Sequence, residues 1–410
     1  MILPILGGYF LDTFGTSGLL LFALSSAFFG QFIFSVGIEA RKYWIMLTGR
    51  TIFGFGGELT EVIQTTITSI WFADWYLSLA LALNLTIARI GAAVNDILSP
   101  LFENAYNVAF ASWFGLGMVV ISFICGLFLI YFIMEYKPPG SESLIIDDST
   151  TSYSIDEIST SKPKALSVFQ HLTDFPLAFW ILNLICVCYY GVVVPFVHIS
   201  SDFLQAKYPY LDARSAGQLI SIPDWISAFG SPICALGLDF WIMRRKKGKR
   251  AISYEAIISD DKQEIEIREV SAHEKRIEGL DVDAGRFLLP IAGLIVAFAH
   301  FLFITTNLPP ALMLVMLGFS YSCFGAILWP MVSYLVPKNQ LGTAYGILTI
   351  SLNASLSIFP IIVAKLRIIA TNFSLALWFF AGMSLTGMTL SIVLCVVCHR
   401  MLKHLGRLRI

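Results

Sequence analysis

Residues 109–134 read AFASWFGLGMVVISFICGLFLIYFIM and contain no charged side chain. A helix needs about 20 apolar residues to cross the roughly 30 Å hydrocarbon core of a bilayer, and this run is long enough. The same length criterion gives ten candidate spans along the chain, at residues 19–38, 44–70, 77–101, 109–134, 177–199, 214–242, 287–306, 311–335, 341–364 and 374–398. The sequence therefore predicts an all-α polytopic membrane protein.

The composition supports a membrane protein and argues against several other classes. Of the 410 residues, 57% are hydrophobic and only 13% are charged, whereas about a quarter of the residues in soluble proteins are charged. The net charge of −1 does not favour nucleic-acid binding, and the seven cysteines are too sparse for a secreted disulfide scaffold. The chain has neither a Walker-type phosphate loop nor a His-Glu-x-x-His motif. We therefore expect no enzyme activity, no cofactor and no metal.

Two polar segments interrupt the spans and predict the domain organisation. One is rich in Ser, Thr and Asp, and the other opens with Arg-Arg-Lys-Lys-Gly-Lys-Arg. Most Lys and Arg residues lie on one side if both segments are cytosolic. We predict an N-terminal helix bundle, a cytosolic linker, a C-terminal bundle with a cytosolic loop and a cytosolic tail, at residues 1–135, 136–175, 176–398, 244–285 and 399–410 respectively. Residues 1–6 resemble the end of a further helix, so we expect the N-terminal bundle to lack its first helix.

Two opposite charges are predicted to lie deep in the membrane. Glu58 lies near the centre of span 44–70, and Arg89 lies at the centre of span 77–101. Because consecutive spans are antiparallel, both side chains should reach about the same depth, where a charge is retained mainly when it is paired or lines a wet cavity. One interpretation is an ion pair that only fixes helix packing. The other is a cavity for a zwitterionic ligand, with its ammonium at Glu58 and its carboxylate at Arg89.

Other ionisable residues in the spans have two interpretations each. Glu61 lies one turn from Glu58, which is compatible with proton binding, although a hydrated carboxylate at the cytosolic mouth also fits. Arg50 lies about 12 Å from Glu58 along the helix axis and is predicted to be structural or to line a gate. For Asp224, which follows Pro223, a role in a helix kink is favoured over ligand contact.

Aromatic and amide side chains of the later spans are candidates for the rest of a pathway. They are Tyr189, Tyr190, Tyr321, Trp329, Tyr345 and Asn353. The alternative for each aromatic residue is ordinary packing, and for Asn353 it is a hydrogen bond between helices.

Two short motifs resemble a known superfamily. Gly8-Tyr-Phe-Leu-Asp12-Thr-Phe-Gly15 resembles the core of the loop between helices two and three in the major facilitator superfamily. The segment from Pro232 to Asp239 looks like its counterpart in the second half of the chain. The resemblance implies two helix bundles, with each acid contacting the end of a neighbouring helix. It also implies that Asp12 and Asp239 help to control the inward gate.

Five further motifs resemble the lysosomal dipeptide transporters known as major facilitator superfamily domain-containing protein 1. They are Gly49-Arg-Thr-Ile-Phe-Gly-Phe-Gly-Gly-Glu58, Ala88-Arg-Ile-Gly-Ala-Ala-Val-Asn95, Ile185-Cys-Val-Cys-Tyr-Tyr190 with Pro195-Phe196, Leu328-Trp-Pro-Met-Val332 and Gln340-Leu-Gly-Thr-Ala-Tyr-Gly346. This resemblance implies dipeptide uniport by alternating access in the lysosomal membrane, with Glu58 and Arg89 contacting the peptide termini. It also implies a single-pass, glycosylated lysosomal membrane protein as partner.

Two alternatives to dipeptide transport are compatible with the sequence. One is a transporter of organic anions or single amino acids. The other is a non-transporting membrane receptor or scaffold, which the expected loss of the first helix would favour.

Overall fold

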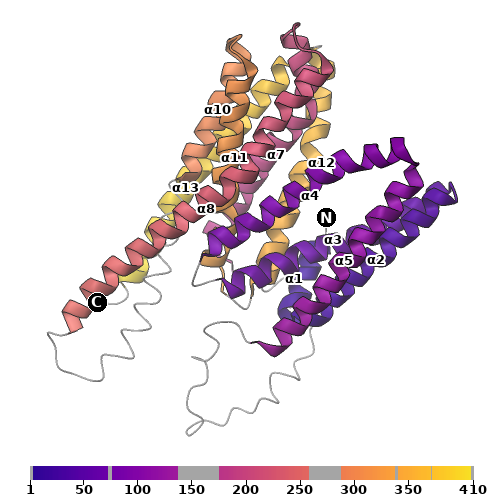
Figure 1. Cartoon of the computed structure of the whole chain (residues 1–410). Coiled ribbons are helices and arrows are strands. Elements are labelled where there is room, and N and C mark those ends of the chain that lie inside the picture. Colours follow the sequence, from indigo (N-terminus) through magenta and orange to yellow (C-terminus); the bar gives the residue numbers. More distant parts are fainter. Residues whose placement is uncertain are drawn as a thin grey trace. The chain divides into compact units, whose positions relative to one another are not determined.

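The computed structural model describes residues 3–72, 76–136, 175–257, 288–337, 340–370 and 372–407. These residues form eleven helices and no strand (Figure 1). The helices are α1 (Leu3–Phe14), α2 (Thr16–Glu39), α3 (Tyr43–Trp71), α4 (Leu77–Ala105), α5 (Val108–Glu135), α7 (Leu177–Lys207), α8 (Ala213–Ile257), α10 (Leu288–Thr305), α11 (Pro310–Leu335), α12 (Leu341–Ala370) and α13 (Ser374–Arg407).

The predicted all-helical membrane fold is confirmed. Each of the ten predicted spans corresponds to a helix of the described residues. Eight of these helices are long and apolar enough to cross a membrane by length and composition, namely α2, α5, α7, α8, α10, α11, α12 and α13. Helix α4 has a shorter apolar stretch, Leu77–Gly91. Helix α3 is less apolar because it carries Arg50, Glu58 and Glu61.

Several helix ends differ from the prediction. The first helix does not end near residue 6 but continues to Phe14, so most of the Gly8–Gly15 motif is helical and not a loop. The turn comes at Gly15, whose φ of 82° lies in the left-handed region that favours glycine. Helix α8 continues to Ile257 instead of ending near 242, since Arg and Lys are good helix formers outside the bilayer too. Most of the predicted linker and loop, residues 137–174 and 258–285, lies outside the described residues.

The chain divides into two compact units. Unit 1 comprises Met1–Trp71, Ala93–Phe175 and Lys338–Ile347, and unit 2 comprises Phe72–Ala92, Pro176–Pro337 and Leu348–Ile410. The boundaries therefore pass through two helices, α4 and α12. The predicted bundles at 1–135 and 176–398 stay a prediction.

Unit 1 is built on the close packing of α2 against α3 and α5. Leu11, Leu20 and Leu24 form a buried cluster with Leu59 and Ile63 of α3. Small residues allow the approach of α2 and α3, because a Cβ added at Gly30 would overlap the backbone of Phe53. Such packing holds helices together in lipid, where apolar burial alone provides little driving force.

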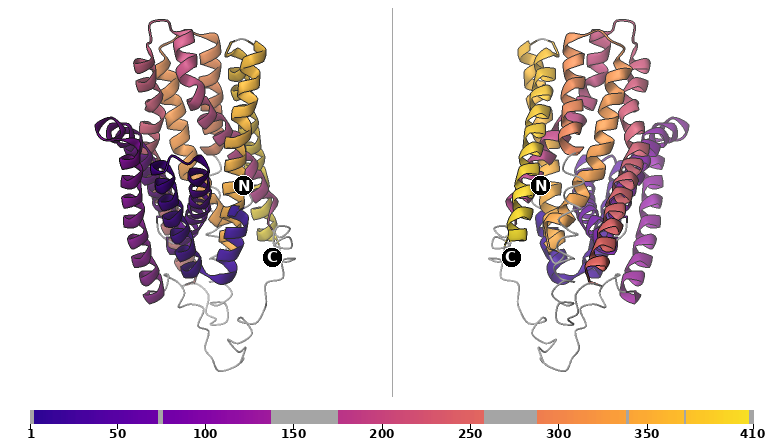
Figure 2. Two further views of the ribbon diagram at one scale, coloured as in Figure 1. Left: turned by 90° about the vertical axis from the view of Figure 1, so that its right-hand side faces the viewer. Right: turned by 90° about the vertical axis from the view of Figure 1, so that its left-hand side faces the viewer.

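Unit 2 has an aromatic core between α7, α10 and α13. The rings of Phe196 and Phe380 meet edge to face with centroids 5.9 Å apart, and those of Phe203 and Phe303 do so at 5.3 Å. Edge-to-face contacts are a favoured arrangement of aromatic rings. Helix α8 packs along α11 in the same unit. Figure 2 shows these long helices, coloured from pink to yellow, lying beside one another.

A carboxylate caps the start of a helix in each unit. In unit 1, Asp12 accepts hydrogen bonds from the backbone N–H groups of Gly342 (2.9 Å) and Thr343 (2.7 Å), and from the Thr343 hydroxyl (2.7 Å). In unit 2, Asp239 accepts from the backbone N–H groups of Ser78 (3.2 Å) and Leu79 (2.8 Å). The first N–H groups of a helix lack intrahelical acceptors, and the helix dipole favours a negative charge there. Each acid therefore ties its own helix to the start of another.

Replacing Asp239 by Ala should destabilise the protein, because two backbone donors of α4 lose their acceptor. We expect the free energy of unfolding to fall by about 1–3 kcal/mol. Thermal unfolding in detergent, followed by tryptophan fluorescence, measures the change. Asp202→Ala removes an exposed carboxylate and is the control. An equal loss of stability in both variants would contradict the capping role.

Glycines 8 and 346 permit the approach of α1 and the start of α12 within unit 1. A Cβ at Gly8 would overlap the carbonyl of Gly342, and a Cβ at Gly346 would overlap that of Pro4. Gly346→Ala should therefore lower the free energy of unfolding by about 1–3 kcal/mol, as overpacking does elsewhere. Gly18→Ala is the matched control, since a Cβ there meets nothing within 4 Å. Thermal unfolding of the two variants compares them, and equal midpoints would rule out a steric need for glycine at 346.

Candidate functional site

Arg89 is held in place by groups from two other helices of unit 2. Its guanidinium carbon lies 4.2 Å from the centroid of the Tyr321 ring on α11. One of its nitrogens, Nη1, lies 3.5 Å from the hydroxyl of Ser231 on α8 as a long hydrogen bond. One turn earlier in α4, the hydroxyl of Thr86 donates to the carbonyl of Ala228 at 2.8 Å. This second bond fixes α4 against α8 at the level of the arginine.

Two buried aromatic residues extend this arrangement. The indole N–H of Trp329 on α11 donates to the hydroxyl of Tyr190 on α7 at 3.1 Å. The Tyr190 ring meets the Tyr321 ring edge to face, with centroids 5.9 Å apart. Tyr190 and Trp329 are only 4% and 3% exposed. We call Arg89, Ser231, Tyr321, Tyr190 and Trp329 the Arg89 cluster.

The Arg89 cluster is suited to binding an oxyanion. A guanidinium carries five N–H donors in a planar fork, and the Ser231 bond uses one of them among the described residues. Contact with the Tyr321 ring face stabilises the cation and leaves the edge of the fork available. Arg89 is half-buried, so such bonds would be stronger than in bulk water. The carboxylate of Asp224 on α8 also lies within electrostatic reach of Arg89.

The predicted partner charge, Glu58, belongs to the other unit. It lies on α3 and is half-buried, next to the buried Leu59. Glu61 follows one turn later on the same helix and is exposed. Arg89 is part of unit 2 and Glu58 part of unit 1. The pairing of the two charges at one depth therefore stays a prediction.

The remaining predicted residues have separate surroundings. Arg50 lies over the Phe34 ring, with its guanidinium carbon 3.8 Å from the centroid, as a cation–π contact between α3 and α2. Tyr345 is fully buried in unit 1, where its hydroxyl bonds to that of Ser69 at 2.7 Å. Asn353 is half-buried on α12 in unit 2. The structure thus brings Arg89, Tyr190 and Trp329 together, and the substrate-binding roles of all predicted residues stay predictions.

Ser231 was not among the residues predicted from the sequence. A signal for it exists, because Asp224, Ser227 and Ser231 recur at spacings of three and four residues and so share one face of α8. A polar stripe on an otherwise apolar membrane helix indicates a face that contacts polar groups of the protein. What the stripe does not reveal is that its partner is Arg89.

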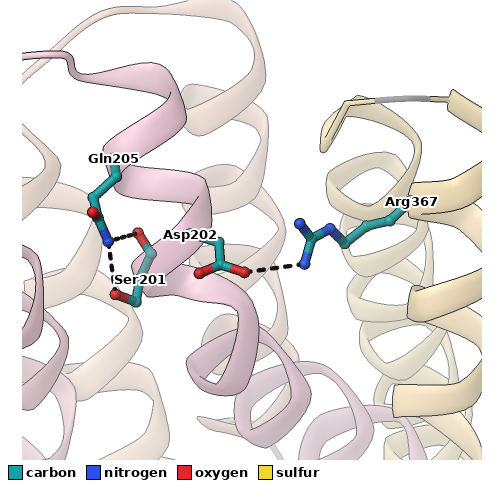
Figure 3. Close-up of polar contacts among 4 residues, drawn as sticks. All are labelled: Ser201, Asp202, Gln205 and Arg367. Atoms are coloured by element: carbon teal, nitrogen blue, oxygen red, sulfur yellow. Dashed lines mark hydrogen bonds and ion pairs between the residues drawn. The ribbon is translucent and has the colours of Figure 1, made fainter. Parts of the chain in front are cut away.

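A second ionic contact in unit 2 joins the ends of α7 and α12. Arg367 Nη1 donates to Asp202 Oδ2 at 3.3 Å (Figure 3). The side chain of Gln205 bonds to Ser201 one turn away. The two charged side chains are 38% and 64% exposed. Ion pairs with this much solvent contact typically contribute at most about 1 kcal/mol to stability. Among the described residues, no group of three or more His, Cys, Asp or Glu is placed to hold a metal ion.

Comparison with known proteins identifies relatives over almost the whole chain. The lysosomal dipeptide transporter MFSD1 of Homo sapiens is 28% identical over 407 residues, which cover 98% of this chain and 76% of that relative. The MFSD1 proteins of Mus musculus and Danio rerio are 28% and 25% identical and cover 97% and 93% of this chain, with 74% and 72% of their own lengths matched.

Solved transporter structures share the fold. The E. coli fucose:proton symporter FucP superposes with a TM-score of 0.59 at 16% identity, over 96% of this chain and 87% of that chain. A bacterial homologue of the iron transporter ferroportin, in an outward-facing state, superposes with a TM-score of 0.61 at 14% identity, over 97% of this chain and 87% of that chain. The family model described as Major Facilitator Superfamily matches residues 1–253. Because this match covers more than half of a multi-helix membrane chain, the protein belongs to the Major Facilitator Superfamily of transporters.

Proposed function

We propose that this transporter moves dipeptides across the lysosomal membrane by alternating access, as a uniporter. The name shared by its relatives supports both the substrate class and the membrane. The observation that carries the proposal is the Arg89 cluster, in which a half-buried guanidinium rests on an aromatic ring inside an apolar unit. A cation is costly at such depth, so a substrate anion gives a further reason, beside the contacts with Tyr321, Ser231 and Asp224, to keep one there.

In this proposal Arg89 binds the carboxylate at the C-terminus of the peptide. Arginine and carboxylate match as a two-pronged pair, which fixes orientation as well as adding energy. Tyr190 and Trp329 of the Arg89 cluster are aromatic, and the indole N–H of Trp329 already bonds to the hydroxyl of Tyr190. They therefore favour flat or apolar parts of a ligand over a second charged group.

Glu58 binds the ammonium at the other end of the peptide in this proposal. The central position of Glu58 in α3 supports this role. The other charged residues of that helix, Arg50 and Glu61, lie eight residues before Glu58 and three residues after it. If only the two peptide termini are bound through charge, the side chains of the peptide can vary widely. The transporter would then accept many dipeptides of different sequence.

The proposal extends to the gate and to a partner. Asp12 and Asp239 each hold the first turn of another helix, and loss of these bonds would free that helix end for movement. We propose that they stabilise one state of the alternating cycle. A single-pass, glycosylated lysosomal membrane protein is the proposed accessory partner.

The roles of the two charges can be separated with chemically blocked ligands. Binding of alanyl-alanine, its N-acetyl form and its C-terminal amide is measured by thermal-shift titration of the purified protein. In the natural chain, each blocked ligand should bind roughly 10- to 100-fold more weakly, because a bond to a charged group contributes about 1.5–3 kcal/mol. In Arg89→Ala, amidation of the peptide should weaken its binding little further. In Glu58→Gln, N-acetylation should weaken its binding little further.

The control for this experiment is Lys365→Ala, which removes an exposed charge of unit 2 and should keep the full discrimination. Arg89→Ala should also abolish dipeptide uptake in proteoliposomes while the protein stays folded. If the amide binds as well as the free dipeptide to the natural chain, the assigned role of Arg89 fails. Stronger binding of monocarboxylates or single amino acids would favour those substrates instead. Binding without any uptake would favour a receptor.

Tyr321 should support binding through its ring face. Tyr321→Leu removes the cation–π contact with Arg89, which is worth about 0.5–2 kcal/mol. We expect KM for dipeptide uptake to rise about 2- to 30-fold, by conversion of that free energy. Tyr321→Phe keeps the face and loses only the hydroxyl, so its KM should remain near that of the natural chain. A larger rise in KM in Tyr321→Phe than in Tyr321→Leu would show that the hydroxyl of Tyr321, and not its ring face, supports binding.

A further inference from the structure

Two cysteines of unit 2 face each other across a helix contact. Cys234 of α8 and Cys323 of α11 are 89 positions apart in sequence, and their sulfur atoms lie 3.6 Å apart. Helices α8 and α11 pack along each other, and Cys234 lies against the buried alanines 82, 235 and 326. The backbone on both sides of the pair is therefore held by packing. A disulfide needs an S–S separation of about 2.05 Å, so the two sulfurs must approach by about 1.5 Å.

The pair is more accessible than most other cysteines of the chain. Cys234 and Cys323 are both partly exposed, whereas Cys186, Cys188 and Cys398 are buried. A small reagent therefore meets less surrounding structure at these two residues than at the three buried cysteines. Access and thiol character decide which cysteines are oxidised.

The pair also lies beside the Arg89 cluster. Cys234 is one helical turn from Ser231 on α8, and Cys323 is two residues from Tyr321 on α11. Both neighbours contact Arg89 directly. A covalent bond between the cysteines would fix the distance between the two helices that hold the guanidinium. Any rearrangement of α8 against α11 during transport would then be hindered.

We propose that Cys234 and Cys323 form a redox modification site, which a small organic disulfide converts into a disulfide bond between α8 and α11. The thiolate of one cysteine attacks the reagent, forms a mixed disulfide and releases one reagent thiol. The second cysteine attacks the mixed disulfide, forms the S–S bond of the protein and releases the second reagent thiol. The two protein thiols are oxidised, the reagent is reduced to two thiols, and the protons of the cysteines pass to them.

The test uses the full chain in proteoliposomes treated with dithiodipyridine, a small apolar disulfide. Remaining thiols are blocked with N-ethylmaleimide, and the digest is analysed by mass spectrometry without reduction. We expect a linked peptide containing Cys234 and Cys323, which disappears after treatment with dithiothreitol. Cys125, which is exposed, should carry a mixed disulfide and so reports that the reagent was active. Modified Cys125 without the linked peptide overturns the proposal.

Two single variants separate the bond from general thiol modification. Cys234→Ser and Cys323→Ser should fold normally, because Ser is close to Cys in size and both sites are partly exposed. Oxidation should raise the thermal midpoint by several degrees in the natural chain and not in either variant, since the bond closes a long loop of the unfolded chain. Uptake should fall on oxidation and recover on reduction only in the natural chain. The same loss of uptake in both variants would place the effect at another cysteine and contradict this site.

Discussion

The cost of holding a charge in an apolar environment governs the structure around Arg89. The guanidinium cannot be left among alkyl groups, so a ring face, a hydroxyl and the field of Asp224 compensate it. Each of these groups comes from a different part of α8 or α11, and so the position of the arginine requires those helices to pack in one register. The bond between Thr86 and the Ala228 carbonyl fixes that register from the side of α4.

The helices themselves were predictable, because a bilayer imposes a length and a composition on every segment that crosses it. The run at 109–134, for example, became α5 with its ends displaced by one residue each. The predicted helix ends were wrong where the bilayer imposes no such constraint. Helix α8 continues through a basic segment beyond its apolar part, where a helix can extend through any good helix-forming sequence. At α1, the Gly-rich motif was interpreted as a loop, yet only Gly15 leaves the helical conformation.

The candidate site was predictable in its charges and not in its contacts. Arg89 could be found because an arginine at the centre of a largely apolar segment is energetically costly and is therefore retained for a structural or functional reason. Tyr190 and Trp329 were candidates on weaker grounds, and the structure joins them by a hydrogen bond. Ser231 was missed, since a serine is ordinary in a membrane helix and its importance depends on how α4 and α8 pack. The polar stripe on α8 indicates a face that contacts polar groups, but which residue of α4 it meets depends on the packing of the two helices and cannot be derived from either sequence alone.

The length of α8 has a mechanical consequence. Its 45 residues extend for about 67 Å, more than twice the thickness of the hydrocarbon core, and its apolar part ends near Trp241. About 24 Å of helix therefore continues past the apolar part without a break, as a stiff rod attached to the segment that carries Ser231. A force from a protein or a lipid surface that bends or twists this extension would therefore be transmitted along α8 to Ser231, which contacts Arg89.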